Sequence, residues 1–479
     1  MLFNSLIFLL VFLPLFLLGW YKIKLVKGKL VLLTGFSFIF YGYWDFRFVG
    51  LMLFSILVDF YCGQQISKHL NKSKKRARNW MIVSVVINLG ILGFFKYFNF
   101  FIDTFYTAFP IEDIINRPAL TIILPLGISF YTFQSMSYSV DLYRKQAEPV
   151  DSILHFSAYV SMFPQLIAGP IVRYRDMHKQ LKNISNKIDY GLIYTGLFFF
   201  IFGLSKKLFV ADYFAKWADL FFNGSMDKLF FVSWSGVVSY AFQIFFDFSA
   251  YSDMAIGLGM MFGFRLPQNF NSPYKATSFS DFWRRWHMTL SQFLRDYLYI
   301  PLGGNRKGEV RTYYHLILTM LLGGLWHGAS WLFVIWGAIH GFFLALERLI
   351  GANKLVNSYL YRAFVFVGVC VAWIFFRSNS LDFALHTLKS CLFINGIESF
   401  TTDTYPIGAN ISLPIFVRMA GGIKHIMALV VTLIALNILP NLHQISPPKK
   451  MWFAFLMAFM MFAVLFHVQK PSPFIYFQF

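Results

Sequence analysis

Residues 2–21 read LFNSLIFLLVFLPLFLLGWY and are followed by Lys22, Lys24, Lys27 and Lys29. A membrane-crossing helix needs roughly 20 mostly apolar residues, and this stretch is about that long. It lacks the basic leading segment and the small-residue cleavage site of a signal peptide. We therefore expect a retained first span whose lysine-bearing end lies in the cytoplasm, where Lys and Arg concentrate in membrane proteins.

The composition of the whole chain extends this pattern. Of its 479 residues, 57% are hydrophobic and only 13% are charged, whereas soluble proteins carry about 25% charged residues. Further apolar stretches cover residues 80–101, 120–140, 153–172, 191–210, 230–262, 313–346, 363–376, 425–439 and 451–468. The length allows on the order of ten spans with short loops. We expect an all-α integral membrane protein of the cell inner membrane, in which residues 1–479 form a single polytopic domain.

The net charge of +20 comes from 42 Lys and Arg against 22 Asp and Glu. Binding to nucleic acid is the usual inference from such a balance, but here the basic residues stand in short runs between apolar stretches. That arrangement sets the orientation of a membrane protein, so we expect no nucleic-acid partner. The three cysteines are far apart in sequence and predict neither a metal site nor a disulfide framework.

One apolar stretch, residues 153–172, contains Pro164 and Pro170 and is poorly suited to a straight span. We expect this stretch to be re-entrant. Non-helical backbone at membrane depth is tolerated only where protein or a water-filled cavity covers it. The prediction therefore requires that this part of the chain be enclosed.

Polar residues concentrate between residues 247 and 341, which we expect to be the catalytic core segment. It begins with Asp247 and Asp253 in apolar surroundings. Such carboxylates usually face the protein interior or a cavity, and a solvated helix end at the interface is the alternative. Further along, Ser278–Asp281 fits the capping-box pattern of a helix start. We expect an amphipathic helix over residues 281–300 that lies at an interface or lines a funnel.

This helix would carry three arginines, Arg284, Arg285 and Arg295. One interpretation pairs them with Asp281, Asp296 or lipid phosphates. The other makes them a dock for an anionic acyl donor at the cytoplasmic face, because guanidinium groups suit the geometry of phosphate. On the second interpretation, Arg284 and Arg285 are candidate donor-binding residues.

Residues 323–331 read GGLWHGASW and place His327 inside an apolar stretch. The glycines would let another helix or a substrate approach the backbone, but helix packing does not account for an imidazole. A buried histidine without a partner costs free energy, and its neutral form can take a proton from a hydroxyl group. His340 lies thirteen residues further on, about 220° around an ideal helix, so we expect it to pack on another face.

Several segments of this region resemble, in order, the motifs of the membrane-bound O-acyltransferases. The similar segments are residues 269–274 (NFNSPY), 282–287 (FWRRWH), 295–300 (RDYLYI), 302–306 (LGGNR) and 323–331, together with the terminal residues 473–479 (PFIYFQF). The resemblance covers nearly the whole chain. The LGGNR segment favours the polysaccharide-acetylating branch of the family over the D-alanyl-transferring branch.

The resemblance implies a ring of membrane helices around a thin centre with a tunnel or funnel. It implies that His327 is catalytic, as general base or in orienting the hydroxyl, and that His287 is a second catalytic histidine, which polarises the carbonyl group or positions the donor. The donor would be acetyl-CoA or another acyl thioester, such as an acylated carrier protein, with no bound cofactor or metal. A separate periplasmic protein would then place the acetyl group on an exported polysaccharide, alginate or a similar exopolysaccharide, which this chain would contact only indirectly.

Three other functions remain open from the sequence. A membrane transporter would also carry buried charges and broken helices, although many transporters contain internal repeats and this chain shows none. A non-catalytic scaffold of a polysaccharide export complex would use His327 only for packing. Within the enzyme class, peptidoglycan or teichoic acid could be the acceptor instead.

Overall fold

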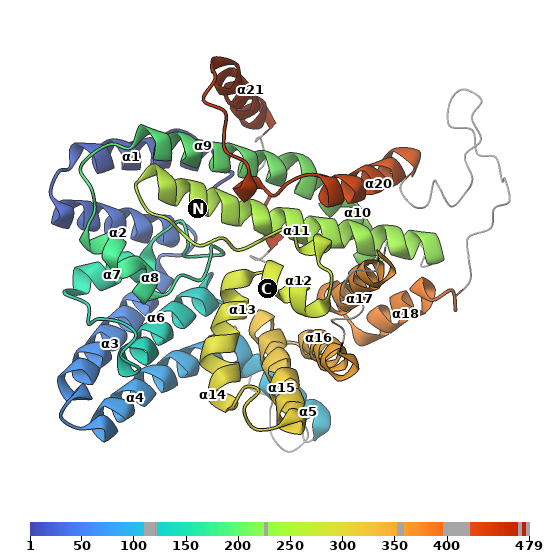
Figure 1. Ribbon diagram of the computed structural model, residues 1–479, viewed down its shortest axis with the longest axis horizontal. Coiled ribbons are helices and arrows are strands. Elements are labelled where there is room, and N and C mark those ends of the chain that lie inside the picture. Colours follow the sequence, from blue (N-terminus) through green and yellow to red (C-terminus); the bar gives the residue numbers. More distant parts are fainter. Residues whose placement is uncertain are drawn as a thin grey trace. The chain divides into compact units, whose positions relative to one another are not determined.

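The computed structural model describes residues 1–109, 120, 122–224, 229–351, 359–395, 422–467 and 472–475. These residues form helices and connecting loops, with no strand among them (Figure 1). The prediction of an all-α protein is confirmed. The similarity noted for residues 476–479 lies outside the described residues.

Six helical segments among the described residues are long and apolar enough to cross a membrane. They are Arg47–Leu70, Lys74–Ala108, Tyr190–Phe222, Trp331–Ile350, Tyr359–Arg377 and Gly422–Gln444. Two shorter apolar helices cover Phe8–Lys22 and Met451–His467. The first of these corresponds to the predicted first span. The chain is an integral membrane protein with multiple apolar helices.

The chain divides into two compact units that alternate along the sequence. Unit 1 contains Met1–Leu204, Tyr251–Gln268 and Pro447–Gln478, and unit 2 contains Ser205–Ala250 and Asn269–Ser446. The predicted catalytic segment 247–341 contributes residues to both units. The single domain over residues 1–479 and the ring with a thin centre stay predictions.

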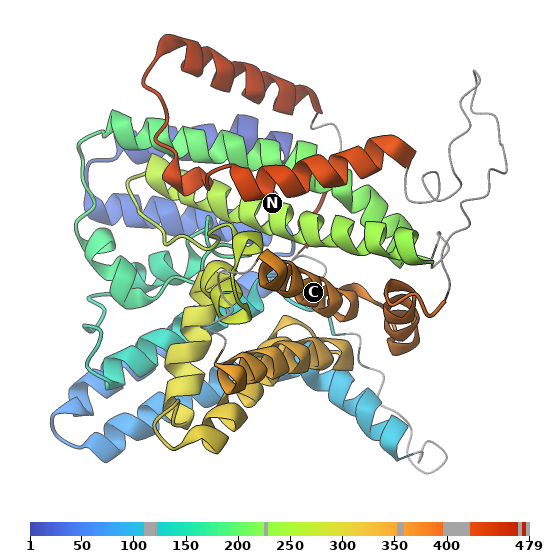
Figure 2. The same cartoon turned by 45° about the vertical axis from the view of Figure 1, so that its right-hand side comes forward.

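The helices of unit 1 pack around aromatic and polar clusters. They are α1 (Leu13–Lys22), α2 (Val26–Gly42), α3 (Arg47–Leu70), α4 (Lys74–Leu92), α5 (Phe98–Ala108), α6 (Ile128–Tyr143), α7 (Ile153–Ser161), α8 (Tyr174–Lys182), α9 (Tyr190–Ser205) and α21 (Met451–His467). Helices α3 and α4 lie side by side in both views (Figures 1 and 2). The buried Asp59 of α3 accepts hydrogen bonds from Ser84 Oγ at 2.6 Å and from Asn88 Nδ2 at 2.8 Å, both on α4. These bonds satisfy a carboxyl group that would otherwise be costly to bury.

The proline-containing stretch of unit 1 is enclosed, as a re-entrant segment requires. Helix α7 ends at Ser161, and residues 162–173 continue without helical structure. All of these non-helical residues are buried. Protein therefore covers the irregular backbone.

Unit 2 contains the segments that carry the predicted site. Its helices are α10 (Asp212–Phe222), α12 (Phe279–Arg285), α13 (Met288–Leu294), α14 (Ile300–Leu302), α15 (Glu309–His327), α16 (Trp331–Ile350), α17 (Tyr359–Arg377), α18 (Leu381–Cys391) and α20 (Gly422–Ile438), with π-helical turns η3 (Lys206–Ala211) and η5 (Arg295–Tyr299). The long helix α11 (Phe230–Met261) has residues in both units.

Two predicted helices are interrupted in the structure. The helix expected over residues 281–300 begins earlier, at Phe279, with Ser278 Oγ accepting a hydrogen bond from Asp281 N at 2.9 Å. It breaks at Trp286 and His287, and α13 starts at Met288. The prediction of one continuous helix was wrong because His287 adopts a left-handed backbone conformation, with φ of +40°.

The apolar stretch 313–346 also forms two helices, α15 and α16. Ser330 Oγ accepts a hydrogen bond from Leu332 N at 3.2 Å and caps α16. The two helices, gold in Figures 1 and 2, pack along each other through glycines. A Cβ atom on Gly324 would lie 2.2 Å from a backbone oxygen of α16, and one on Gly337 would lie 2.3 Å from a backbone oxygen of α15. Of the two interpretations left open for this glycine-rich sequence, the structure supports close helix packing for these positions.

Candidate active site

His327 is the last residue of α15 and is almost completely buried, with 4% of its surface exposed. Its ring packs edge-on against three aromatic side chains. The ring centroids lie 5.0 Å from Trp326, 5.0 Å from Trp336 of α16 and 5.3 Å from Phe376 of α17. The break after His327 places the imidazole at a helix end, against two further helices.

His287 occupies the left-handed turn between α12 and α13, and Asn269 holds that turn. The backbone N–H of Met288 donates to the carbonyl oxygen of Asn269 at 2.9 Å. Asn269 Oδ1 accepts from the backbone N–H and the hydroxyl of Thr289, at 3.3 and 2.9 Å. A non-glycine residue in this conformation costs about 1–2 kcal/mol, and such residues cluster at functional sites. The NFNSPY segment thus explains how His287 keeps an unfavourable backbone.

The side-chain amide of Asn269 also determines which nitrogen of the His287 ring carries the hydrogen. His287 Nδ1 lies 3.1 Å from Asn269 Oδ1. Because that oxygen accepts from the backbone N–H of Thr289, it is the carbonyl side of the amide. His287 Nδ1 therefore carries the hydrogen, and Nε2 carries a lone pair. Burial lowers the pKa of His287 to about 3, so the ring is neutral near pH 7.

The two predicted histidines both pack against one indole ring, that of Trp326. The ring centroid of Trp326 lies 6.1 Å from that of His287 and 5.0 Å from that of His327. Phe248 of α11 also packs edge-on against His287, at 4.7 Å. Residues forty apart in sequence therefore share one buried aromatic environment.

His340 belongs to the same cluster, which the sequence did not indicate. Its Nδ1 accepts a hydrogen bond from Trp283 Nε1 at 3.3 Å, so its Nε2 carries the hydrogen. Trp336 lies 4.9 Å from His340 and 5.0 Å from His327, measured between ring centroids. The expectation that His340 would pack on another face assumed one helix through residues 328–330, and the structure has a break there, so both histidines pack against Trp336.

Among the buried N–H groups of this cluster, those of His340 and Trp336 need an acceptor. His340 Nε2 and Trp336 Nε1 find no hydrogen-bond partner among the described residues, and both side chains are 0% exposed. They lie four residues apart on α16 and so on one helix face. A buried donor without an acceptor costs about 1–3 kcal/mol. The ring of Trp336, which carries one of these groups, packs against both His327 and His340.

A pocket of about 350 Å³ adjoins this cluster within unit 2. Its walls come from α12, α13, η5, α15 and α16, and the lining side chains include Trp283, Arg284, Arg295, Leu294 and Met320. Trp283 connects the pocket to the histidines, because its ring packs 5.7 Å from that of Trp336. The pocket thus has cationic and apolar walls and ends on the aromatic cluster.

The three arginines of this region have different surroundings. Arg285 Nε lies 2.9 Å from Asp281 Oδ2, and Arg295 Nε lies 2.7 Å from Asp296 Oδ1. Arg284 is exposed at the pocket and forms no ion pair within the described part of the chain. Arg285 does not line the pocket. The geometry therefore favours Arg284 together with Arg295, rather than Arg285, as cations that could meet a donor.

The carboxylate of Asp247 is buried in an ion pair that the sequence did not reveal. Lys207 Nζ lies 2.6 Å from Asp247 Oδ1 and 2.8 Å from Asp212 Oδ1. The side chains of Lys207 and Asp247 are each only 3% exposed. Of the two interpretations of Asp247, the structure excludes the solvated helix end. Forty residues separate the partners, so no local pattern could pair them.

Comparison with known proteins identifies the family. A family model described as MBOAT, the membrane-bound O-acyltransferase family, matches residues 144–376. The chain is 44% identical over 390 residues to the "Probable alginate O-acetylase AlgI" of Azotobacter vinelandii, covering 80% of this chain and 76% of that protein. It is 40% identical over 433 residues to the peptidoglycan O-acetyltransferase of Helicobacter pylori, covering 83% and 81%. The chain belongs to the membrane-bound O-acyltransferase family.

This acyltransferase is also similar to the teichoic acid D-alanyltransferase of Bacillus subtilis, at 29% identity over 243 residues. That similarity covers 47% of this chain and 59% of the relative. The expected resemblance and the expected enzyme class are therefore confirmed. His287 and His327 both lie inside the matched range 144–376, and their catalytic roles stay predictions.

Proposed function

We propose that this acyltransferase moves an acetyl group from a cytoplasmic thioester to a hydroxyl group, for the O-acetylation of an exported polysaccharide. The observation that carries the proposal is the single buried cluster containing His287, His327 and the N–H donors of Trp336 and His340. Such a cluster supplies a base and hydrogen-bond donors, which acyl transfer requires. Acetyl is proposed as the transferred group because the relatives from Azotobacter vinelandii and Helicobacter pylori are both named for O-acetylation.

The chemical step follows from these groups. His327 removes the proton from the attacking hydroxyl as its oxygen forms a bond to the thioester carbonyl carbon. Negative charge develops on the carbonyl oxygen, to which Trp336 Nε1 and His340 Nε2 donate hydrogen bonds. The carbon–sulfur bond then breaks, and the leaving thiolate takes the proton from His327. The products are an acetyl ester and a free thiol.

His287 has a more limited role in this scheme than the family resemblance implied. Its Nε2 carries a lone pair and the ring is neutral, so it accepts a hydrogen bond rather than donating one to a carbonyl oxygen. Of the two roles expected, positioning fits this protonation state and carbonyl polarisation does not. In our proposal His287 orients a hydroxyl or amide group of a substrate.

The donor is acetyl-CoA or an acylated carrier protein, and its anionic end would meet Arg284 and Arg295 at the pocket. Arg295 takes the place of Arg285 in this proposal because Arg285 does not line the pocket. The acyl end would extend past Trp283 toward His327. The protein would act in the cell inner membrane, with basic loops in the cytoplasm.

The first acceptor would be a hydroxyl group of a periplasmic partner protein, which would then pass the acetyl group to a sugar hydroxyl of the polymer. The relatives are named for alginate and for peptidoglycan at similar identity and coverage, so the similarity supports both polymers. Alginate or a similar exopolysaccharide is favoured by the slightly higher identity, 44% against 40%.

The proposal is tested with the purified protein in liposomes, acetyl-CoA labelled in the acetyl group and an oligosaccharide acceptor, with and without the partner protein. Labelled ester and free CoA should form in equal amounts. A transporter would move the donor intact, and a scaffold would form neither product. Trp336→Phe keeps an aromatic ring but removes the donor, and should lower kcat by about 10²–10³-fold. An unchanged kcat would exclude Trp336 from the chemical step.

A further inference from the structure

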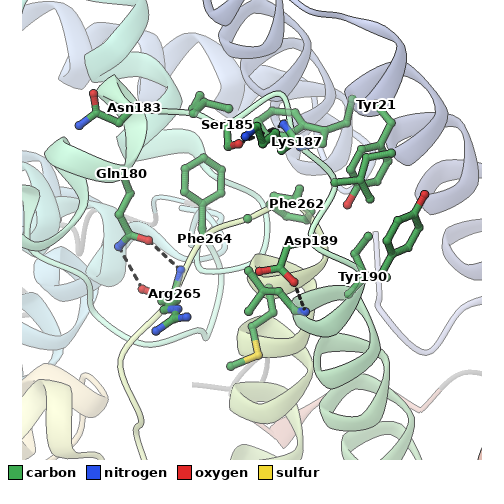
Figure 3. A pocket seen from close by; sticks show the side chains of 17 residues that line it. Tyr21, Gln180, Asn183, Ser185, Lys187, Asp189, Tyr190, Phe262, Phe264 and Arg265 are labelled. Carbon is green, nitrogen blue, oxygen red and sulfur yellow. Dashed lines mark hydrogen bonds between the residues drawn. The ribbon is translucent and has the colours of Figure 1, made fainter. Parts of the chain in front are cut away.

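A second large pocket lies in unit 1, at the ends of three helices. It has a volume of about 600 Å³ and is formed where α1 and α11 end and α9 begins (Figure 3). Helix α9 opens one of the apolar segments long enough to cross a membrane. The pocket therefore lies at the start of a candidate membrane span. It adjoins residues 22–29, whose lysines the sequence predicts to lie in the cytoplasm.

Two cations line this pocket and are available to a ligand. Lys187 and Arg265 are exposed, and neither forms an ion pair within the residues described. Figure 3 shows how the backbone of Arg265 is fixed: its N–H donates to Gln180 Oε1 at 2.8 Å, and Gln180 Nε2 donates to its carbonyl at 3.2 Å. The guanidinium group thus projects from a held backbone, in the manner that suits recognition of phosphate.

Asp189, the one carboxylate among the described residues that line the pocket, caps a helix. Asp189 Oδ1 accepts the backbone N–H of Leu192 at 2.9 Å, in the first turn of α9 (Figure 3). The carboxylate is thereby held at a helix N-terminus, where negative charge is favoured. The carboxylate keeps its charge, but Lys187 and Arg265 outnumber it, so the described lining of the pocket carries a net positive charge.

An apolar groove continues from the same place. Tyr190, which is 76% exposed, lines both the pocket and a second hollow of about 400 Å³. That hollow lies between the starts of α9 and α21, with Tyr194, Met451 and Ala454 as apolar walls and two lysines, Lys449 and Lys450, at its edge. The Tyr194 hydroxyl donates to the carbonyl of Pro448 at 2.7 Å and fixes this edge. A cationic pocket thus leads into an apolar groove.

We propose that the pocket and groove bind an anionic phospholipid. The phosphate and head group lie against Lys187 and Arg265, the glycerol region passes Tyr190, and an acyl chain follows the groove along α9 and α21. Basic pockets between helices at the cytoplasmic face are where anionic head groups bind. A soluble nucleotide would use the cationic pocket but would leave the apolar groove empty.

The test uses the full chain in detergent and measures the melting temperature against short-chain dioctanoyl phosphatidylglycerol, with dioctanoyl phosphatidylcholine for comparison. The anionic lipid should stabilise the protein saturably and the zwitterionic lipid should not. Each cation near a lipid head group is worth about fivefold in affinity. The double variant Lys187→Gln/Arg265→Gln should therefore bind the lipid about 30-fold more weakly.

Two further variants separate this site from general electrostatics. The matched control Lys72→Gln/Lys75→Gln removes two exposed lysines of another basic segment, at the start of α4, and should change the affinity less than twofold. Ser185→Trp fills the pocket without changing its charge and should abolish the lipid effect. An equal response to both lipids, an equal loss in the control, or full binding by Ser185→Trp would overturn the proposal. Displacement of the anionic lipid by free CoA would also overturn it and would assign the pocket to a nucleotide.

Discussion

Replacing Glu347 by Gln should loosen the helix that carries Trp283 and Arg284. The buried carboxylate of Glu347, on α16, caps the start of α12: Oε1 accepts from Phe279 N at 2.6 Å and Oε2 from Ser280 N at 2.9 Å. The Tyr361 hydroxyl donates to Oε1 at 2.6 Å. A glutamine has the same shape but only one accepting oxygen. One N–H of α12 would then face an amide NH₂ group.

The loss of one hydrogen bond to a charged acceptor costs about 1.5–3 kcal/mol, and the remaining bonds become weaker neutral ones. Together these changes should lower the free energy of opening the first turn of α12 by about 3 kcal/mol. The open form would then be about a hundredfold more populated. Hydrogen–deuterium exchange measured by mass spectrometry on the purified protein reports this opening directly. Peptides that cover α12 should exchange faster in Glu347→Gln, and peptides that cover α3 and α4 should not change.

Glu309→Gln is the matched control. Glu309 pairs with Arg348 through two contacts of 2.9 Å, but its side chain is 65% exposed. Exposed ion pairs contribute little to stability, so exchange in α12 should stay as in the unchanged protein. Equal exchange of α12 in Glu347→Gln and the unchanged protein would refute the proposed role of Glu347. So would an equal effect of both substitutions.

Three further predictions concern packing, pH and the donor pocket. Gly324→Ala would place a Cβ atom 2.2 Å from a backbone oxygen of α16 and should destabilise the protein by about 1–3 kcal/mol or more; Gly35→Ala, with nothing within 4 Å, should leave the melting temperature nearly unchanged. Because burial lowers the pKa of His287 from 6.5 to about 3, acidification to pH 5 protonates it only in the unfolded chain. The free energy of unfolding should therefore be about 2 kcal/mol lower at pH 5 than at pH 7. Urea titrations at the two pH values measure this loss, which His287→Gln should not show. Arg284→Gln should raise KM for the thioester about tenfold with kcat unchanged; an equal KM effect in Arg285→Gln, whose partner is Asp281, would contradict the assignment.

The sequence predicted those features that local patterns determine. Apolar stretches such as residues 80–101, 191–210 and 363–376 became apolar helices, and the cap at Ser278 forms as its spacing indicated. The buried non-helical segment after α7 contains Pro164 and Pro170, as the sequence indicated. The motif around residues 323–331 drew attention to His327, which the structure places in the aromatic cluster.

Features that depend on distant partners were not predictable. The apolar periodicity runs through Trp286 and His287 without interruption, and the turn there forms because Asn269, eighteen residues earlier, holds it. The predicted angle between His327 and His340 assumed that one helix contains both residues. In the structure α15 ends at His327 and α16 begins at Trp331. The pairing of Lys207 with Asp247 links a π-helical turn to another helix, and no spacing rule connects these positions.

The central claim is that His327 takes the hydroxyl proton during acyl transfer. The most direct measurement is the single-turnover rate of ester formation from labelled acetyl-CoA by His327→Ala in liposomes, with His178→Ala, which removes a histidine that contacts Glu148 near the surface, as control. We expect His327→Ala to fold and bind donor normally but to form ester about 10²–10⁴-fold more slowly, while His178→Ala keeps the original rate. A normal rate in folded His327→Ala would contradict the account.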